Sequence, residues 1–134
     1  MKIARLRFAL IAAVLAVSTI AASAAAERGT AAQTIEGLGT ATFPTAARSD
    51  AAQTAFVRGL LLLHLFEYPA AAMAFEQAEK LQPDFAMAYW GEAMTYNHGI
   101  WNQLDVDAGR AALAKLGPTP AARAARAPTA RENA

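Results

Sequence analysis

The sequence predicts an all-α fold built from short helical hairpins. Hydrophobic residues make up 55% of the 134 residues, and alanine, the strongest helix former, is abundant among them. No stretch alternates β-branched with polar residues as a half-buried strand does. Capping residues, prolines and glycines instead divide residues 49–117 into segments of helical length joined by short turns. These observations together favour a repeated order of helix, turn and helix.

Local signals bound the first two helices. Ser49 or Asp50 can cap a helix that runs to about Phe66, where the tripeptide EYP interrupts it. The second helix begins at Pro69, which a first turn tolerates because the N–H that proline lacks would have no partner there. It ends before Pro83. On this helix we expect a solvated polar face that contains Glu76, Glu79 and Lys80.

The third helix is expected over residues 85–98, with Asp84 as its cap and Gly99 as its terminator. The connection that follows is longer than the other turns, and we expect that it can carry function. A fourth helix then begins at Asp105 or Asp107 and ends at Leu116.

Residues of the first and third helices recur with a period of 34. Small, aromatic, aliphatic and imidazole side chains repeat in register, and the pairs are Gly59 and Ala93, Phe56 and Trp90, Leu60 and Met94, Leu62 and Tyr96, and His64 and His98. A helix–turn–helix period of this length is typical of tetratricopeptide repeats. Over residues 49–117 the chain resembles exported bacterial tetratricopeptide-repeat (TPR) proteins, in the repeat-defining residues Gly59, Ala71, Phe75, Ala78 and Pro83 of one unit and Tyr89, Ala93 and Tyr96 of the next.

The resemblance implies an α-solenoid of about two units plus the start of a third. Two features depart from the pattern: Arg58 and Glu92 replace a preferred leucine, and the turn of the second unit is long. A single repeat cannot bury its own apolar face, so at least three are usually needed. In residues 118–134 we expect a short helix from Thr119, and a capping box at residues 129–132 predicts the start of a further helix. We therefore expect the chain to be an N-terminal fragment of a longer array.

The N-terminus resembles a secretory signal. Three basic residues precede an uncharged apolar run over residues 8–22, and small residues suited to cleavage follow. We expect a signal peptide over residues 1–24 and a location in the periplasm, with an uncleaved membrane anchor as the alternative. Residues 25–48 are interpreted as a linker whose Leu38 and Phe43 dock on the domain. Without the signal the net charge is about −2, which argues against a nucleic-acid binder.

The resemblance also implies a concave groove lined by the first helix of each unit. We expect this groove to bind a protein or peptide, through the residues Phe56, Leu60, His64, Met87, Trp90, Met94, Asn97 and His98. The alternative is that the same stripe is core and packs against an adjacent repeat or the linker. No cofactor is expected.

Two other functions stay open. One is an enzyme or metal protein that uses His64, His98 and Glu92 with residues beyond this chain. The sequence lacks an HExxH motif, a dense cluster of metal ligands and a phosphate-binding loop. We therefore expect no enzyme. The other is a purely architectural scaffold of an envelope complex.

Overall fold

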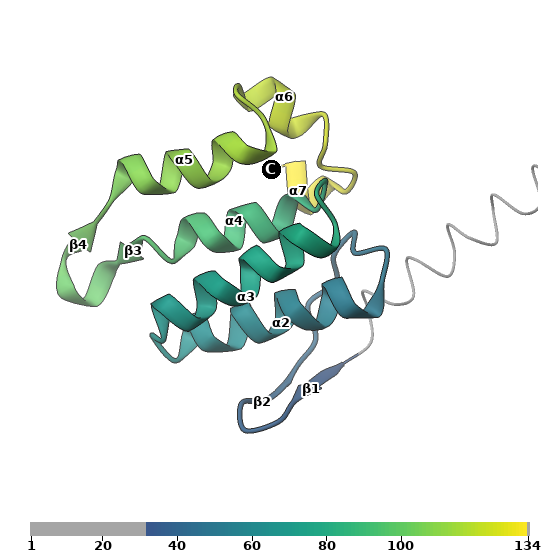
Figure 1. Ribbon diagram of the computed structural model, residues 1–134, viewed down its shortest axis with the longest axis vertical. Helices are drawn as coiled ribbons and strands as arrows, with labels where there is room; N and C mark the ends of the chain where they lie inside the picture. Colours follow the sequence, from purple (N-terminus) through teal and green to yellow (C-terminus); the bar gives the residue numbers. More distant parts are fainter. Residues whose placement is uncertain (1–31, 134) are drawn as a thin grey trace, which may run out of the picture.

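The computed structural model describes residues 32–133, which form a mostly helical domain with two small β-hairpins (Figure 1). The expected signal peptide lies outside these residues. The helices are α2 (Asp50–His64), α3 (Tyr68–Leu81), α4 (Ala86–Met94), α5 (Val106–Leu116), α6 (Pro120–Ala124) and α7 (Ala130–Asn133). The hairpins are β1 (Gln33–Ile35) with β2 (Gly39–Ala41), and β3 (Asn97–His98) with β4 (Gln103–Leu104), between which lies the 3-10 turn η1 (Gly99–Trp101).

Local capping starts several of these helices where the sequence predicts. The side chains of Ser49, Asp105 and Thr119 each accept a hydrogen bond from a backbone N–H in the first turn of α2, α5 and α6, at 3.2, 2.9 and 3.1 Å. The capping box at the start of α7 is also present, because Thr129 and Glu132 exchange hydrogen bonds. Asp84, however, does not cap α4; it pairs with Arg48 at 2.6 Å, and this pairing lowers the pKa of its carboxyl.

The helices pack as pairs. α2 lies against α3, α4 lies against α5, and α3 joins the two pairs through its contact with α4 (Figure 1). The prediction of helical hairpins is therefore confirmed at this level. Within the described residues no helix is long and apolar enough to cross a membrane.

Phenylalanine rings from three parts of the chain form the centre of the core. Phe56 lies 5.7 Å from Phe75 and 5.5 Å from Phe85 between ring centroids, and all three side chains are fully buried. The ring of Phe75 fits because two glycines face it. A methyl group added at Gly59 would lie 2.8 Å from that ring, and one at Gly91 still closer. Glycine at both positions thus lets α2 and α4 approach α3 closely.

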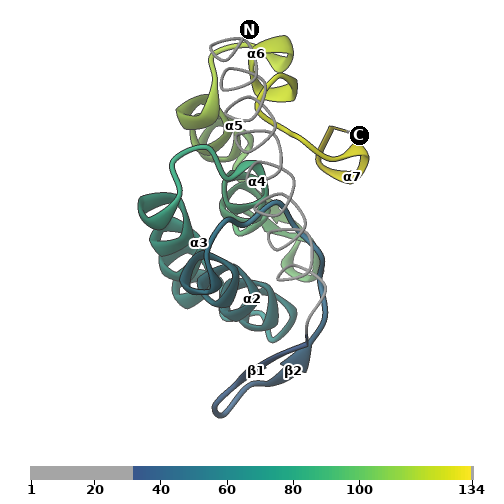
Figure 2. The same ribbon diagram turned by 90° about the vertical axis from the view of Figure 1, so that its right-hand side faces the viewer.

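The described part of the expected linker, residues 32–48, packs on the helices. The β1–β2 hairpin packs on α2, and Leu38 and Phe43 contact the core, as expected for those two residues. Beyond β2 the chain runs extended to the start of α2 (Figure 2). Buried amides hold this extended stretch: Gln53 Nε2 donates to Phe43 O at 2.9 Å, and Gln82 donates to Ala46 O at 3.2 Å.

Side chains from later in the sequence also bind the backbone of this extended stretch. Arg48 N donates to Gln82 Oε1 at 2.7 Å, and near the C-terminus Glu132 Oε1 accepts from Ala46 N at 3.0 Å. The guanidinium group of Arg131 lies 5.1 Å from the ring of Phe43. Side chains from two distant parts of the sequence thus satisfy backbone groups that a linker would leave to water.

The third helix is shorter than predicted. α4 ends at Met94 rather than His98, because the hydroxyl of Thr95 donates to Glu92 O at 2.6 Å and the chain then leaves the helix. Asn97 and His98 instead pair with Leu104 and Gln103 in the β3–β4 hairpin.

Candidate binding surface at the α2–α3 turn and the α4–α5 loop

The α2–α3 turn and the α4–α5 loop meet at one end of the molecule, on the left in Figure 1. Their exposed or half-buried apolar side chains form what we call the loop-end surface, made of Leu65, Phe66, Tyr68, Ile100, Trp101, Leu104 and Val106. Most of these side chains are about half exposed or more, and Ile100 reaches 68%. Apolar side chains gathered in this way mark interaction sites more often than isolated ones do.

Aromatic contacts hold the two segments together. The ring of Trp101 meets Phe66 and Tyr68 edge-on, with centroid distances of 5.7 and 5.9 Å. Tyr68 also stacks on His98 at 3.9 Å. These offset and edge-to-face arrangements are the favourable ones for aromatic pairs. These contacts therefore hold the rings of Phe66, Tyr68 and Trp101 in a fixed arrangement, although Phe66 and Trp101 are about half exposed.

Phe66 has an unusual backbone conformation. Its φ is 62°, in the left-handed region. Phe66 N donates to Leu63 O at 3.1 Å and Glu67 N donates to Leu62 O at 3.0 Å, which is the hydrogen-bond pattern of a Schellman motif. The left-handed position of this motif is usually glycine, because a Cβ atom is strained there. No glycine marks the end of α2, and the predicted end near Phe66 rested on the tripeptide EYP that follows.

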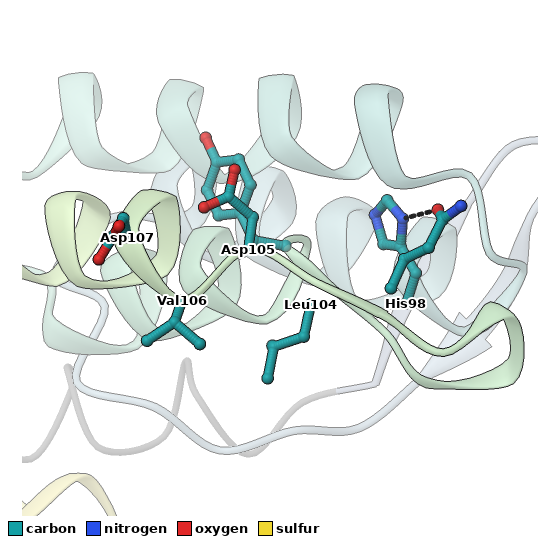
Figure 3. Close-up of a pocket in the computed structure, with 7 residues that line it drawn as sticks. His98, Leu104, Asp105, Val106 and Asp107 are labelled. Carbon is teal, nitrogen blue, oxygen red and sulfur yellow. Dashed lines mark hydrogen bonds between the residues drawn. The ribbon is translucent and has the colours of Figure 1, made fainter.

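A shallow pocket of about 720 Å³ adjoins the aromatic rings. Its lining residues are Tyr96, His98, Gln103, Leu104, Asp105, Val106 and Asp107 (Figure 3). Leu104 and Val106 point to one side of the chain and Asp105 to the other (Figure 3). His98 is held in place, because Nε2 lies 2.8 Å from Thr95 O and Nδ1 lies 3.5 Å from Gln103 Oε1. The pocket thus combines an apolar side with carboxylates.

The structure does not bring all the predicted groove residues to one open surface. Phe56, Leu60 and Met87 are buried and offer little area to a ligand. Phe56 is moreover covered by Phe43, whose ring centroid lies 5.5 Å away. The expectation of an open groove over these three residues is therefore corrected, because the core and the N-terminal segment cover them.

The other predicted groove residues are more accessible. Trp90 is 38% exposed on α4, and Met94 is half-buried. His64, Asn97 and His98 lie at the ends of α2 and α4, and His98 belongs to the pocket described above. Only part of the predicted set therefore reaches the loop-end surface.

The repeat-defining residues lie mainly in the interior. Gly59, Ala71, Phe75, Ala78 and Tyr89 are buried, while Ala93 and Tyr96 are half-buried. Pro83 is exposed, and its carbonyl accepts a hydrogen bond of 2.9 Å from the hydroxyl of Tyr89. Gly91, which the period of 34 does not single out, makes the closest approach to Phe75.

A buried charge cluster joins α3, α4 and α5. Lys115 forms ion pairs with Glu79, at 2.9 Å, and with Glu92. Glu79 and Glu92 are 8% and 4% exposed, so the expectation that Glu79 lies on a solvated face is wrong. It fails because α4 packs on α3 and Lys115 reaches Glu79 from α5, which the pattern of α3 alone cannot reveal.

One cation in this cluster faces two carboxylates. Burial, together with the nearby carboxylate of Glu92, raises the pKa of Glu79 to about 7, and Lys115 opposes this rise only in part. Glu79 Oε1 accepts no hydrogen bond from the described residues. A proton on Glu79 would remove the excess negative charge and hydrogen-bond to Glu92.

The remaining histidine is also engaged locally, because His64 Nδ1 lies 2.7 Å from Leu60 O. Among residues 32–133, no three His, Asp or Glu side chains gather as a group that could hold a metal ion. None of the pockets described for this part of the chain is lined by Glu79, Glu92 or Lys115.

The fold and the surface define a small helical domain with an exposed aromatic end. No family model, curated protein or solved structure matches the chain.

Proposed function

We propose that this protein is a helical-hairpin scaffold of the tetratricopeptide type that binds a segment of another polypeptide. The observation that carries the proposal is the loop-end surface, where Phe66, Tyr68 and Trp101 contact one another while Phe66 and Trp101 stay about half exposed. Rigid, partly exposed aromatic side chains are typical anchors of protein interfaces. The paired helices and the 34-residue recurrence of the sequence support the repeat assignment.

The binding site that we propose is displaced from the concave groove that the repeat pattern implies. The N-terminal segment covers Phe56, which the repeat pattern places in that groove, whereas His64 and Asn97 stay exposed. His98 belongs to the groove stripe expected from the sequence, and in the structure it stacks on Tyr68 of the loop-end surface and lines the adjoining pocket. Export to the periplasm, proposed from the N-terminal sequence alone, would place the partner outside the cytoplasm.

An enzyme or metal protein is less well supported. Glu92 is buried against Lys115, and His98 stacks on Tyr68 and lies within hydrogen-bonding distance of a backbone carbonyl. These contacts give neither residue a free position beside the other. The geometry thus favours binding over catalysis.

A selection from displayed random dodecapeptides tests the proposal. The purified chain is the target, and each enriched peptide is then measured against Trp101→Ala and against Met73→Ala, a control at an exposed residue of α3. Trp101→Ala should weaken binding about tenfold or more, and Met73→Ala should not change it. Failure to enrich any peptide, or enrichment of peptides that bind both variants equally, would contradict the proposal.

A further inference from the structure

The conformation of Phe66 requires an explanation beyond packing. A non-glycine residue in the left-handed region is strained, and glycine would form the same Schellman motif without that strain. The Phe66 side chain is 48% exposed, so it is not a core residue whose burial alone offsets the strain. Strained residues that persist although an unstrained alternative exists concentrate at functional positions. Within the described part of the chain the ring contacts only the exposed or half-buried rings of Tyr68 and Trp101, so the strain points to a further contact of Phe66 with a partner.

The charge around the loop-end surface has one sign. Neither residues 59–79 nor residues 81–109 contain a lysine or an arginine. Exposed carboxylates border the surface instead, at Glu67, Asp105 and Asp107. The nearest cation along the chain, Arg110, lies 3.9 Å from Asp107 and offsets only one of these charges.

Apolar area and negative charge together specify the partner. We propose that the loop-end surface binds a cationic, apolar peptide segment, in which lysine or arginine flanks an aliphatic or aromatic side chain. The proposal rests on the proposed function and names its class of partner. The apolar side chain would contact Phe66 and Trp101, and the cation would pair with an exposed carboxylate of the same two segments, Glu67, Asp105 or Asp107.

The same charges argue against the main alternative occupants. An anionic lipid surface attracts segments rich in lysine and arginine, and this end of the domain has carboxylates instead. A second copy of the chain in a symmetric contact would bring like charges together, since each copy would present Glu67, Asp105 and Asp107. A cationic polypeptide is the occupant that these charges favour.

The experiment uses the enriched dodecapeptides from the selection described above and the full chain. Phe66→Gly is the decisive variant, because glycine suits the left-handed position and removes only the ring. It should keep the far-ultraviolet circular dichroism and melt within a few degrees of the parent, while binding falls about tenfold or more. An Asp105→Asn, Asp107→Asn double variant should weaken binding several-fold at low salt and less at high salt, because salt screens exposed charges. Met73→Ala is again the control.

The outcomes separate the inference from the proposed function. Enriched peptides rich in lysine or arginine that lose affinity for Phe66→Gly support the inference. Enriched peptides that depend on Trp101 but are acidic or uncharged overturn it and leave the proposed function standing. Equal binding to Phe66→Gly and to the parent also overturns it. Co-sedimentation with vesicles of phosphatidylcholine and phosphatidylglycerol would assign the surface to lipid binding. A dimer in analytical ultracentrifugation that Phe66→Gly abolishes would assign it to self-association. Either result would overturn the inference.

Discussion

Replacing Glu79 by glutamine tests the buried charge cluster, because glutamine keeps the shape of the side chain and carries no ionisable proton. In the parent, one ammonium group, Lys115, faces two buried carboxylates. Burial and the carboxylate of Glu92 raise the pKa of Glu79 from 4.5 to about 7. Between these two values the folded chain binds a proton that the unfolded chain has lost.

The sign and size of the effect follow from this difference. Because the folded state binds more protons in this window, the free energy of unfolding decreases as the pH rises from about 4.5 to about 7. At about 1.4 kcal/mol per pKa unit, the full destabilisation above pH 7 is at most about 3.5 kcal/mol. Glu79→Gln should remove this pH dependence and stabilise the domain by up to about that amount near pH 8, with little change near pH 4.5.

Urea unfolding followed by circular dichroism, repeated from about pH 5 to about pH 8, measures the effect. Glu76→Gln on the same helix is the matched control, because it removes a carboxylate outside the cluster and should keep the parental pH slope. Lys115→Met should act in the opposite direction and destabilise the domain by about 3 kcal/mol near neutral pH, since two buried carboxylates then lack a cation. A Glu79→Gln variant whose stability has the same pH slope as the parent would refute the reasoning.

Three further predictions concern packing, the N-terminal segment and backbone strain. Gly91→Ala should destabilise the domain by about 1–3 kcal/mol, and Gly59→Ala by less, because the added methyl group would lie closer to Phe75 at Gly91 than at Gly59. At Gly109 the added methyl group would make no such close contact. Gly109→Ala should therefore stabilise the domain by about 0.5–1 kcal/mol in the same urea measurement. Equal effects at all three glycines would contradict the packing described here. Gln82→Leu should cost about 1–3 kcal/mol and speed hydrogen exchange at the Arg48 amide, because that amide and Ala46 O lose a buried partner; unchanged exchange would count against the role of Gln82. Phe66→Gly should be more stable than Phe66→Ala by about 1 kcal/mol, since both remove the ring and only alanine keeps the strain; thermal melts in which the two are equal would exclude strain at this position.

The features that could be predicted from the sequence are those that depend on residues within one helical turn, such as the capping of a helix. Ser49, Asp105 and Thr119 cap helices because a side-chain oxygen and a backbone N–H three residues later meet whatever surrounds them. Prolines and the position of Asp105 likewise bound the helices, so the four main helices and their pairing could be predicted. The same local features predicted too long a third helix. Asn97 and His98 pair with Leu104 and Gln103 in the β3–β4 hairpin, and this pairing cannot be recognised from residues within one turn.

The candidate site was predicted only in part. His98 and the long loop through Trp101 were recognised from the sequence, but Phe66 and Tyr68 were not, because their importance comes from contact with that loop across the end of the domain. Phe66 also occupies a position where glycine is the usual marker, so composition gave no signal there.

By itself the sequence determined where helices start, where most of them stop and that they fold back as hairpins, since these depend on neighbours along the chain. Only the tertiary structure decided which faces are buried. Glu79 is buried because α5 brings Lys115 across it, and Gly91 rather than Ala93 receives the ring of Phe75 because of how α3 and α4 pack. Burial of a charge or a ring depends on the partner across the interface, and the chain places that partner through contacts that no local pattern records.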